Sequence, residues 1–254
     1  MGNAVRTLFT SILAALVLAL GLRTVLGAEE LQKIGDVCSR EEAEALGLAC
    51  SEDEPCAVYL ELSSVDGFGA SVFVTGNLHT VDTTISGILL ASADAGKTWS
   101  EPIKRIRAAE LDQIQFADPQ HGWAAGVTLN SLPRDPFLLI TVNGGQMWHQ
   151  VPLFDESMLG AIQQVWFESA NRGQLVVDRS QGQTKRHELY ATTTGGETWT
   201  LKESTDRPIQ IARPGQEAPN WRVVADKDAY RVERRTLSGW ETLARFAIRA
   251  GDCK

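Results

Sequence analysis

The sequence predicts an all-β protein, a β-propeller-like arrangement of about four four-stranded antiparallel blades with a short helix near its start. From residue 57 onward, short runs of Val, Ile, Leu, Phe and Trp alternate with Gly, Asn, Asp and Pro turns, as in antiparallel strands. The runs repeat, and three repeats close on a tryptophan, at Trp99, Trp148 and Trp199, which are 49 and 51 residues apart. Such a period holds four strands and their turns.

Residues 1–27 have the composition of a secretory signal peptide. Arg6 precedes an uncharged and mostly apolar run from Thr7 to Leu22, and small residues lie around Gly27. We expect cleavage after Gly27, export to the periplasm or the exterior, and no stable membrane insertion afterwards. An uncleaved anchor is the alternative, although the run is shorter than the roughly 18 apolar residues typical of a membrane span.

Residues 28–56 form a polar lead-in with a predicted helix. Ser39 and Glu42 have the spacing of a capping box, in which each side chain binds the backbone N–H of the other residue. Gly47 suits the end of the same helix. The sequence therefore predicts a short helix between Ser39 and Gly47.

The four cysteines lie in the part of the chain expected to be exported. An even number of cysteines in an exported protein favours disulfides over metal binding. Four cysteines allow three connectivities, and full pairing joins the lead-in to the end of the chain. We favour Cys38 with Cys50 and Cys56 with Cys253.

Residues 57–250 contain the repeats, and residues 251–254 are expected to form a tail that carries Cys253. The predicted strands of the first three units are 57–62, 71–75, 87–91 and 97–99; 114–116, 122–126, 137–141 and 147–148; 164–167, 173–177, 188–192 and 198–199. Those of the fourth are 209–211, 221–224, 230–234, 238–240 and 244–248. An open stack or a sandwich is the alternative, because a closed ring of four blades must bring its first and last blades together without an exposed sheet edge.

A turn motif closes the first three units, which read SADAGKTW, TVNGGQMW and TTTGGETW. In such a hairpin the Asp accepts backbone hydrogen bonds, the Gly adopts a positive φ, the hydroxyls fix the turn and the Trp packs beneath it. Asn143 and then Thr194 replace the acid while the tryptophan stays, so we predict a structural role. The residues assigned to it are Ser92, Asp94, Gly96, Thr98, Trp99, Thr141, Asn143, Gly145, Trp148, Thr192, Gly196, Thr198 and Trp199.

The first motif resembles the Asp-box, or bacterial neuraminidase repeat. The resemblance implies hairpins between the third and fourth strands of each blade, away from the central face. Phe116 to Gly126, followed by the second motif, also resembles a repeat of the photosystem II assembly and stability factor family. That likeness extends over about half of the chain after residue 27 and implies a propeller, but four units differ from the usual seven, so the photosystem role does not follow.

Catalytic patterns are missing from the sequence. A sialidase needs an arginine cluster, a Tyr nucleophile with a Glu partner and an Asp acid/base, and the Phe/Tyr-Arg-Ile-Pro motif that usually precedes the first Asp-box does not occur. Nucleophile-elbow, phosphate-loop and His-Glu-x-x-His motifs are also missing, and the four histidines are scattered. We therefore predict no catalytic residue, no cofactor and no metal site. The alternative is a carbohydrate-active protein, either a glycan-binding module or a divergent sialidase-like glycosidase.

The formal charge of the chain is −8, which argues against nucleic acid as a partner. Basic residues gather locally: Arg134 lies in a loop, and Arg231, Arg234 and Arg235 lie in one predicted strand. These are candidate partner contacts, or they balance nearby acids. Trp123 and Trp166 fall within strands and are expected in the core, and His121 fits a polar turn. We expect an exported protein-binding scaffold or assembly factor; a glycan is the alternative ligand.

Overall fold

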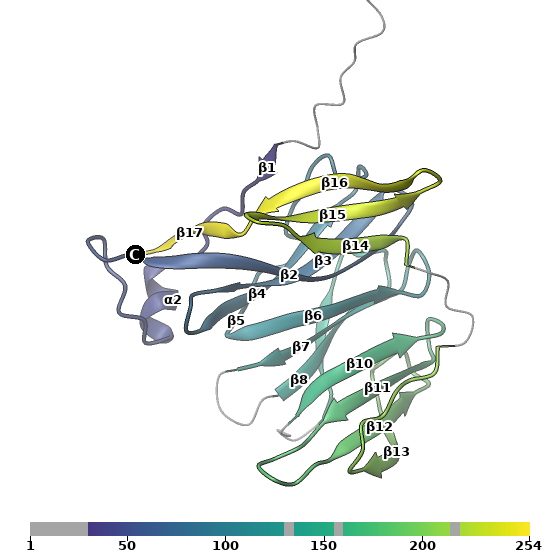
Figure 1. The fold of residues 1–254 in the computed structure, drawn as a ribbon. Helices are drawn as coiled ribbons and strands as arrows, with labels where there is room; N and C mark the ends of the chain where they lie inside the picture. The colour runs from purple at the N-terminus through teal and green to yellow at the C-terminus, as the bar shows by residue number, and fades with distance from the viewer. Residues whose placement is uncertain (1–29, 130–134, 155–159, 214–218) are drawn as a thin grey trace, which may run out of the picture.

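The computed structural model describes residues 30–129, 135–154, 160–213 and 219–254. The expected signal peptide and Arg134 lie outside these residues. The described elements are β-strands and one short helix, and the strands form four sheets (Figure 1). The predicted all-β, propeller-like fold class is confirmed. Within the described ranges, no helix is long and apolar enough to cross a membrane.

Helix α2 (Arg40–Ala45) begins at the predicted capping box. The Ser39 hydroxyl accepts a hydrogen bond from the Glu42 N–H (3.1 Å), and the Glu42 carboxylate accepts one from the Ser39 N–H (2.8 Å). Gly47, with φ of 68°, follows the last turn, as expected for a helix end. The buried side chain of Ala43 packs the helix on the apolar core of the neighbouring sheets.

Three sheets follow the repeats in chain order. Blade 1 contains β2 (Cys56–Phe68), β3 (Ser71–His79), β4 (Thr84–Ser92) and β5 (Ile106–Arg107). Blade 2 contains β6 (Ala109–Phe116), β7 (Gly122–Thr128), β8 (Asp135–Thr141) and β9 (His149–Pro152). Blade 3 contains β10 (Ala161–Phe167), β11 (Gly173–Asp178), β12 (His187–Thr192) and β13 (Thr200–Thr205). The fourth strand of blade 1 was expected at 97–99 but lies at β5. Directly after the turn, the pairing is limited to an isolated bridge between Ala91 and Ser100.

The fourth sheet departs from the predicted strand order. Blade 4 contains β14 (Trp221–Ala225), β15 (Ala229–Thr236) and β16 (Gly239–Ala247), and its outer strand is β1 (Leu31–Gln32), which runs parallel to β16. Residues 209–211, expected as its first strand, belong to none of its ladders. β17 (Arg249–Cys253) pairs with β2, so the expected tail begins within a strand. Each end of the described chain is therefore held by the blade formed by the other end.

One of two disulfides reinforces this crossing of the chain ends. The disulfides join Cys38 to Cys253 and Cys50 to Cys56, so the pairing favoured from the sequence is wrong. Cys253 does lie opposite Cys56 in the β17–β2 ladder, but Cys50 reaches Cys56 across a short turn and Cys38 reaches β17. Two disulfides indicate an oxidising, extracytoplasmic environment.

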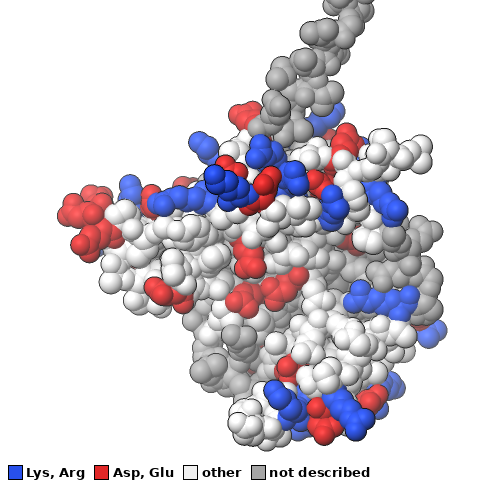
Figure 2. Space-filling model, in the orientation of Figure 1, with Lys and Arg blue, Asp and Glu red and all other residues white. Residues whose placement is uncertain are grey.

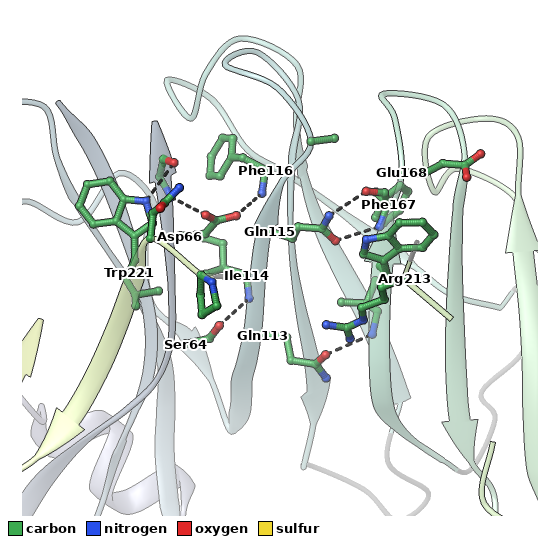
Figure 3. A pocket seen from close by; sticks show the side chains of 17 residues that line it. Ser64, Asp66, Gln113, Ile114, Gln115, Phe116, Phe167, Glu168, Arg213 and Trp221 are labelled. Carbon is green, nitrogen blue, oxygen red and sulfur yellow. Dashed lines mark hydrogen bonds between the residues drawn. The ribbon is translucent and has the colours of Figure 1, made fainter. Parts of the chain in front are cut away.

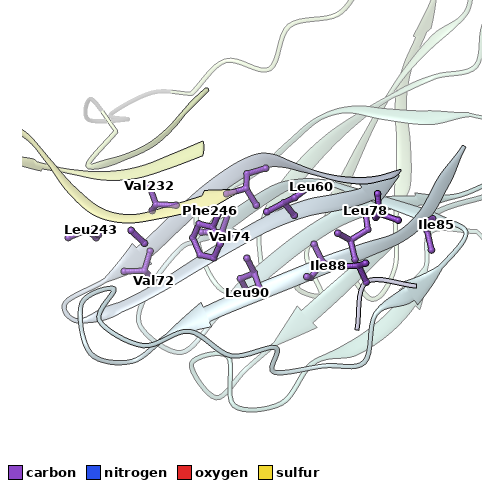
Figure 4. Close-up of a cluster of buried hydrophobic side chains, with 14 of the residues drawn as sticks. Leu60, Val72, Val74, Leu78, Ile85, Ile88, Leu90, Val232, Leu243 and Phe246 are labelled. Atoms are coloured by element: carbon purple, nitrogen blue, oxygen red, sulfur yellow. The ribbon is translucent and has the colours of Figure 1, made fainter. Parts of the chain in front are cut away.

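Apolar clusters hold the blades in the order 4-1-2-3. Blade 4 packs on blade 1 through side chains that include Val232, Phe246, Leu60 and Val74 (Figure 4). Two further clusters join blade 1 to blade 2 and blade 2 to blade 3. Among the described residues no such cluster joins blade 3 to blade 4, and Figure 1 shows them at opposite ends of a fan. The propeller-like fold is an open arc in which the last blade precedes the first.

The turn of the first Asp-box is held together by its acid. Asp94 accepts hydrogen bonds from the N–H groups of Lys97 (3.0 Å) and Thr98 (2.9 Å), from the Thr98 hydroxyl (2.7 Å) and from the Ser92 hydroxyl (2.9 Å). The Trp99 indole donates to the Gly96 carbonyl (3.0 Å). Asn143 and Thr194 accept the corresponding backbone bonds in the other two boxes, so an acid is not required for the turn.

Each box also packs on the blade that precedes its own in the arc. The contacts are Trp99 with Phe246 of blade 4 (5.2 Å between ring centroids), Trp148 with Phe73 of blade 1 (6.1 Å), and the Trp123 indole of blade 2, which donates to the Gly195 carbonyl of the third box (2.7 Å). The boxes are thus joints between blades. Blade 4 has no box, and it is the first blade of the arc, so no blade precedes it.

The acid of the first box gives a pH-dependent contribution that can be measured. Its hydrogen bonds, first that of the Thr98 hydroxyl, hold the pKa of Asp94 at about 2, below the ordinary 3.8. Because the folded state has the lower pKa, the carboxylate contributes fully above pH 3.8, and its contribution is lost as the pH falls through about 2. The difference in Tm between wild type and Asp94→Asn should therefore shrink over this interval in circular dichroism melts.

Asn143 provides the matched control, because it occupies the corresponding place in the second box and does not titrate. The Tm difference between wild type and Asn143→Ala should stay constant over the same pH interval. An Asp94→Asn difference that is equally constant would contradict the predicted titration.

Candidate functional site

The first strands of blades 1 to 3 end around a hollow on the axis of the arc (Figure 3). Residues 64–67 of β2, the end of β6 with residues 113–117, and the end of β10 with residues 165–168 form three of its walls. Arg213 and residues 219–221 complete the lining of a cavity of about 850 Å³. The same ends of the three strands meet here because each repeat begins with a strand that runs in the same direction. Convergence of this kind is typical of binding sites, and the hollow is the candidate site.

Polar side chains at corresponding positions join each inner strand to the next, and we call this series the inner ladder. The backbone donors and their acceptors are Ile114 with Ser64 (3.3 Å), Phe116 with Asp66 (2.7 Å), Val165 with Gln113 (3.1 Å) and Phe167 with Gln115 (2.8 Å). The acceptors on β6 follow those on β2 by 49 residues, the spacing of the first two box tryptophans. The ladder is thus part of the repeat, and it satisfies backbone groups that would otherwise line the cavity unpaired.

The ladder continues one step beyond blade 3. The Gln164 side chain accepts from the Ile211 N–H (3.1 Å) and donates to the Ile209 carbonyl (2.8 Å). Trp166 takes the place that Asp66 and Gln115 have on the preceding strands, and an indole cannot accept such a bond. The ladder ends there.

The two tryptophans expected in the core have different environments. Trp123 is 1% exposed and stacks on Phe167 with 3.7 Å between ring centroids, so that expectation is confirmed. Trp166 is half-buried and lines the hollow, so that expectation is wrong. Trp166 lies on a face of β10 against which no blade packs among the described residues.

Asp66 is the acid in the wall of the hollow. Burial raises the pKa of Asp66, and hydrogen bonds from the N–H groups of Phe116 and Gly67 oppose that rise. Each of its two oxygens accepts one of these bonds. The other lining acid, Glu168, pairs with Arg172 outside the cavity (2.6 Å). Both carboxylates therefore have partners.

The side chains that lack a partner lie at the rim of the hollow. Within the described part of the lining, Trp166, Arg213 and Asn220 have side-chain donors that make no hydrogen bond to the chain. Arg213 and Asn220 are exposed, and Trp166 is half-buried. Together they offer an aromatic surface, a cation and an amide to a ligand. Sequence reasoning missed Arg213 and Asn220, because they lie in the segments between the predicted strands.

Of the basic residues expected as partner contacts, Arg134 is outside the described residues, and Arg231, Arg234 and Arg235 lie on β15, outside the lining of the hollow. Arg231 lies 3.3 Å from the carboxylate of Glu233, which is buried, and Arg234 lies 2.9 Å from that of Glu241. Arg235 is exposed. Figure 2 shows basic and acidic side chains interleaved on this part of the surface. Arg231 and Arg234 thus balance local acids, and the structure brings none of the three β15 arginines to the hollow.

A tyrosine, a glutamate and two arginines do meet, but within blade 3. The buried carboxylate of Glu188 accepts from the Tyr190 hydroxyl (2.7 Å) and pairs with Arg179 (3.1 Å) and Arg186. Burial, with the charge of Glu188, raises the pKa of Tyr190 to about 12, which is opposite to what a nucleophile needs. None of the four lines the hollow. Within the described ranges, no group of three or more His, Cys, Asp or Glu could hold a metal ion.

No family model matches the sequence, and no curated protein matches it. Among solved structures, the GH74 enzyme of Niastella koreensis is 15% identical over 57% of this chain and 22% of that chain, with a TM-score of 0.41. A PL25 ulvan lyase is 9% identical over 79% and 54%, with a TM-score of 0.44. YCF48 from Cyanidioschyzon merolae is 14% identical over 71% and 65%, with a TM-score of 0.24. The chain covers less than two thirds of the length of each, and all three are distant likenesses.

Proposed function

We propose that the protein is an extracytoplasmic, non-catalytic scaffold that binds a partner protein, as an assembly or stability factor would, at its axial hollow. The observation that carries the proposal is the inner ladder, which engages the acid and amide groups of the walls. A general acid or a nucleophile must be free to exchange a proton or attack a substrate. Asp66 accepts two backbone bonds, and Gln113 and Gln115 each bind the next strand. The side chains still available to bind a ligand are those at the rim, Trp166, Arg213 and Asn220.

The rim side chains favour a protein as that molecule. Trp and Arg are enriched among the residues that contribute most to protein interfaces, and Trp166 and Arg213 occur here together with the Asn220 amide. Arg213 and Asn220 are exposed and Trp166 is half-buried, so all three can contact a partner. A glycan is the second candidate, because a tryptophan beside an amide and a cation also suits a sugar ring.

Photo-crosslinking from the rim tests the proposal. A photoreactive phenylalanine analogue replaces Trp166 in the exported chain, and the matched control carries it at Met147, which is 72% exposed on the outer edge of blade 2. We expect the Trp166 probe alone to give discrete protein adducts in the envelope fraction, and Arg213→Glu to reduce them by about tenfold, as for an interface anchor.

The same experiment separates the two candidates. Equal labelling from the two positions would contradict the protein-binding function. Glycan-array binding that disappears in Trp166→Ala, without protein adducts, would favour the glycan.

A further inference from the structure

Residues 209–213, which we call the inner segment, have the hydrogen-bond and burial pattern of a β-strand, although they belong to no sheet. Gln164 binds the N–H of Ile211 and the carbonyl of Ile209 with one side chain. Groups two residues apart point the same way only in an extended backbone. Burial alternates accordingly: Ile211 is buried and Ile209 half-buried, while Gln210 and Ala212 are exposed.

The inner segment stands to β10 as β10 stands to β6. Gln113 accepts from the Val165 N–H and donates to the Ile162 and Gln163 carbonyls (3.5 and 3.4 Å), as Gln164 does to the inner segment one repeat later. The inner segment therefore occupies the place of the first strand of another blade. The chain does not build that blade here, because β14 to β16 pack on blade 1 instead.

The other edge of the inner segment is unpaired. In β10, the N–H groups of Val165 and Phe167 bond to the ladder, so the backbone groups of the alternate residues Gln164 and Trp166 face β11. The corresponding residues of the inner segment are Gln210 and Ala212, and the backbone of neither makes a hydrogen bond to any described residue. An exposed edge of this kind is a template for another strand.

We propose that an extended segment of a partner protein adds to this edge as a β-strand and binds the backbone N–H and C=O groups of Gln210 and Ala212. The proposal rests on the proposed function and specifies how the partner is recognised. Another extended backbone is the occupant that satisfies main-chain donors and acceptors in alternation, which is the basis of strand addition. Opposed residues share a face of a sheet, so the partner places apolar side chains opposite Ile209 and Ile211 and polar ones between them.

Peptides selected at random test this mode without knowledge of the partner. A phage-displayed library of 12-residue peptides is panned against the exported chain, and amide hydrogen exchange is then measured by NMR with and without an enriched peptide. We expect the Gln210 and Ala212 amides to exchange at least about tenfold more slowly in the complex. N-methylation at every second peptide residue should abolish binding in one register and leave it intact in the other, because only one edge of the peptide is bonded.

Two variants provide matched controls. Ala212→Pro removes one of the two N–H donors and should weaken peptide binding at least about tenfold, whereas Gln210→Ala keeps the backbone donor and should bind within about twofold of wild type. Near-UV circular dichroism and peptide binding are measured on the same samples, so that a misfolded Ala212→Pro protein is recognised. N-methylation of the peptide gives the same information without altering the protein.

The proposal fails if no peptide is enriched, if enriched peptides leave the exchange of both amides unchanged, or if binding instead reflects a dimer detected by size-exclusion chromatography. Adducts at position 166 without amide protection would leave the scaffold function standing and reject strand addition. Amide protection without envelope adducts would support strand addition and reject the scaffold function.

Discussion

Replacing Gly145 with alanine is expected to lower the free energy of unfolding by about 3 to 5 kcal/mol. Gly145 has φ of 82°, where an L-residue costs about 1 to 3 kcal/mol. An added Cβ would also lie 2.3 Å from Cε1 of Phe73 on blade 1. Phe73 stacks on Phe116 (4.7 Å between ring centroids) and is 4% exposed, so it has little room to move, and overpacking of this kind costs about 1 to 3 kcal/mol more.

Gly182→Ala is the matched control for this prediction. Gly182 has φ of 54°, and nothing lies within 4 Å of the position of an added Cβ. The variant should therefore lose only the backbone component, about 1 to 3 kcal/mol. Urea denaturation of both variants measures the difference. Equal losses of unfolding free energy in the two variants would show that the second box does not pack tightly on blade 1, contrary to its role as a joint between blades.

The strands and the helix were predictable because their signals are local. Alternation of apolar residues, the Ser39 capping box and the box tryptophans all act within one hairpin or one turn. The partner of each box was not predictable, because Trp99 meets Phe246 from the far end of the chain. A turn motif carries no information about the blade beneath it.

Two signals of the open arc were nevertheless present in the sequence. The fourth unit lacks a box, and a box joins a blade to the one before it. The second signal is Trp166. It occupies the position, one repeat later, of the polar residues Asp66 and Gln115, and so interrupts their series. Neither signal can be interpreted until it is known that each box contacts the preceding blade and that each ladder side chain binds the following strand.

The candidate site was less predictable than the fold. It gathers the ends of three strands about 50 residues apart, and that convergence follows from the repeat. Arg213 and Asn220 lie between the predicted strands 209–211 and 221–224, where no pattern in the sequence marks them as site residues. The disulfide pairing depended on the contact of Cys38 with Cys253 of β17, a long-range contact that cysteine spacing does not encode.

Removing the Cys38–Cys253 disulfide by a double alanine substitution is expected to cost roughly twice as much stability as removing Cys50–Cys56. The first bond joins residues 215 positions apart and the second residues 6 apart. Closing a loop in the unfolded chain restricts it more when the loop is longer, so the chain-entropy relation gives about 5 kcal/mol for the first and about 2 kcal/mol for the second.

Native contacts act in the same direction. Cys253 is fully buried in the core shared by blades 1 and 4, and its bond holds β17 on the edge of β2. Urea denaturation of the two double variants gives both the free energy of unfolding and the m-value, and the m-value should rise more when the longer loop is released. Equal losses would mean that the paired strands β1 and β17 hold the chain ends without the covalent link, and that the crossing of the ends, rather than the disulfide, closes blade 4 onto blade 1.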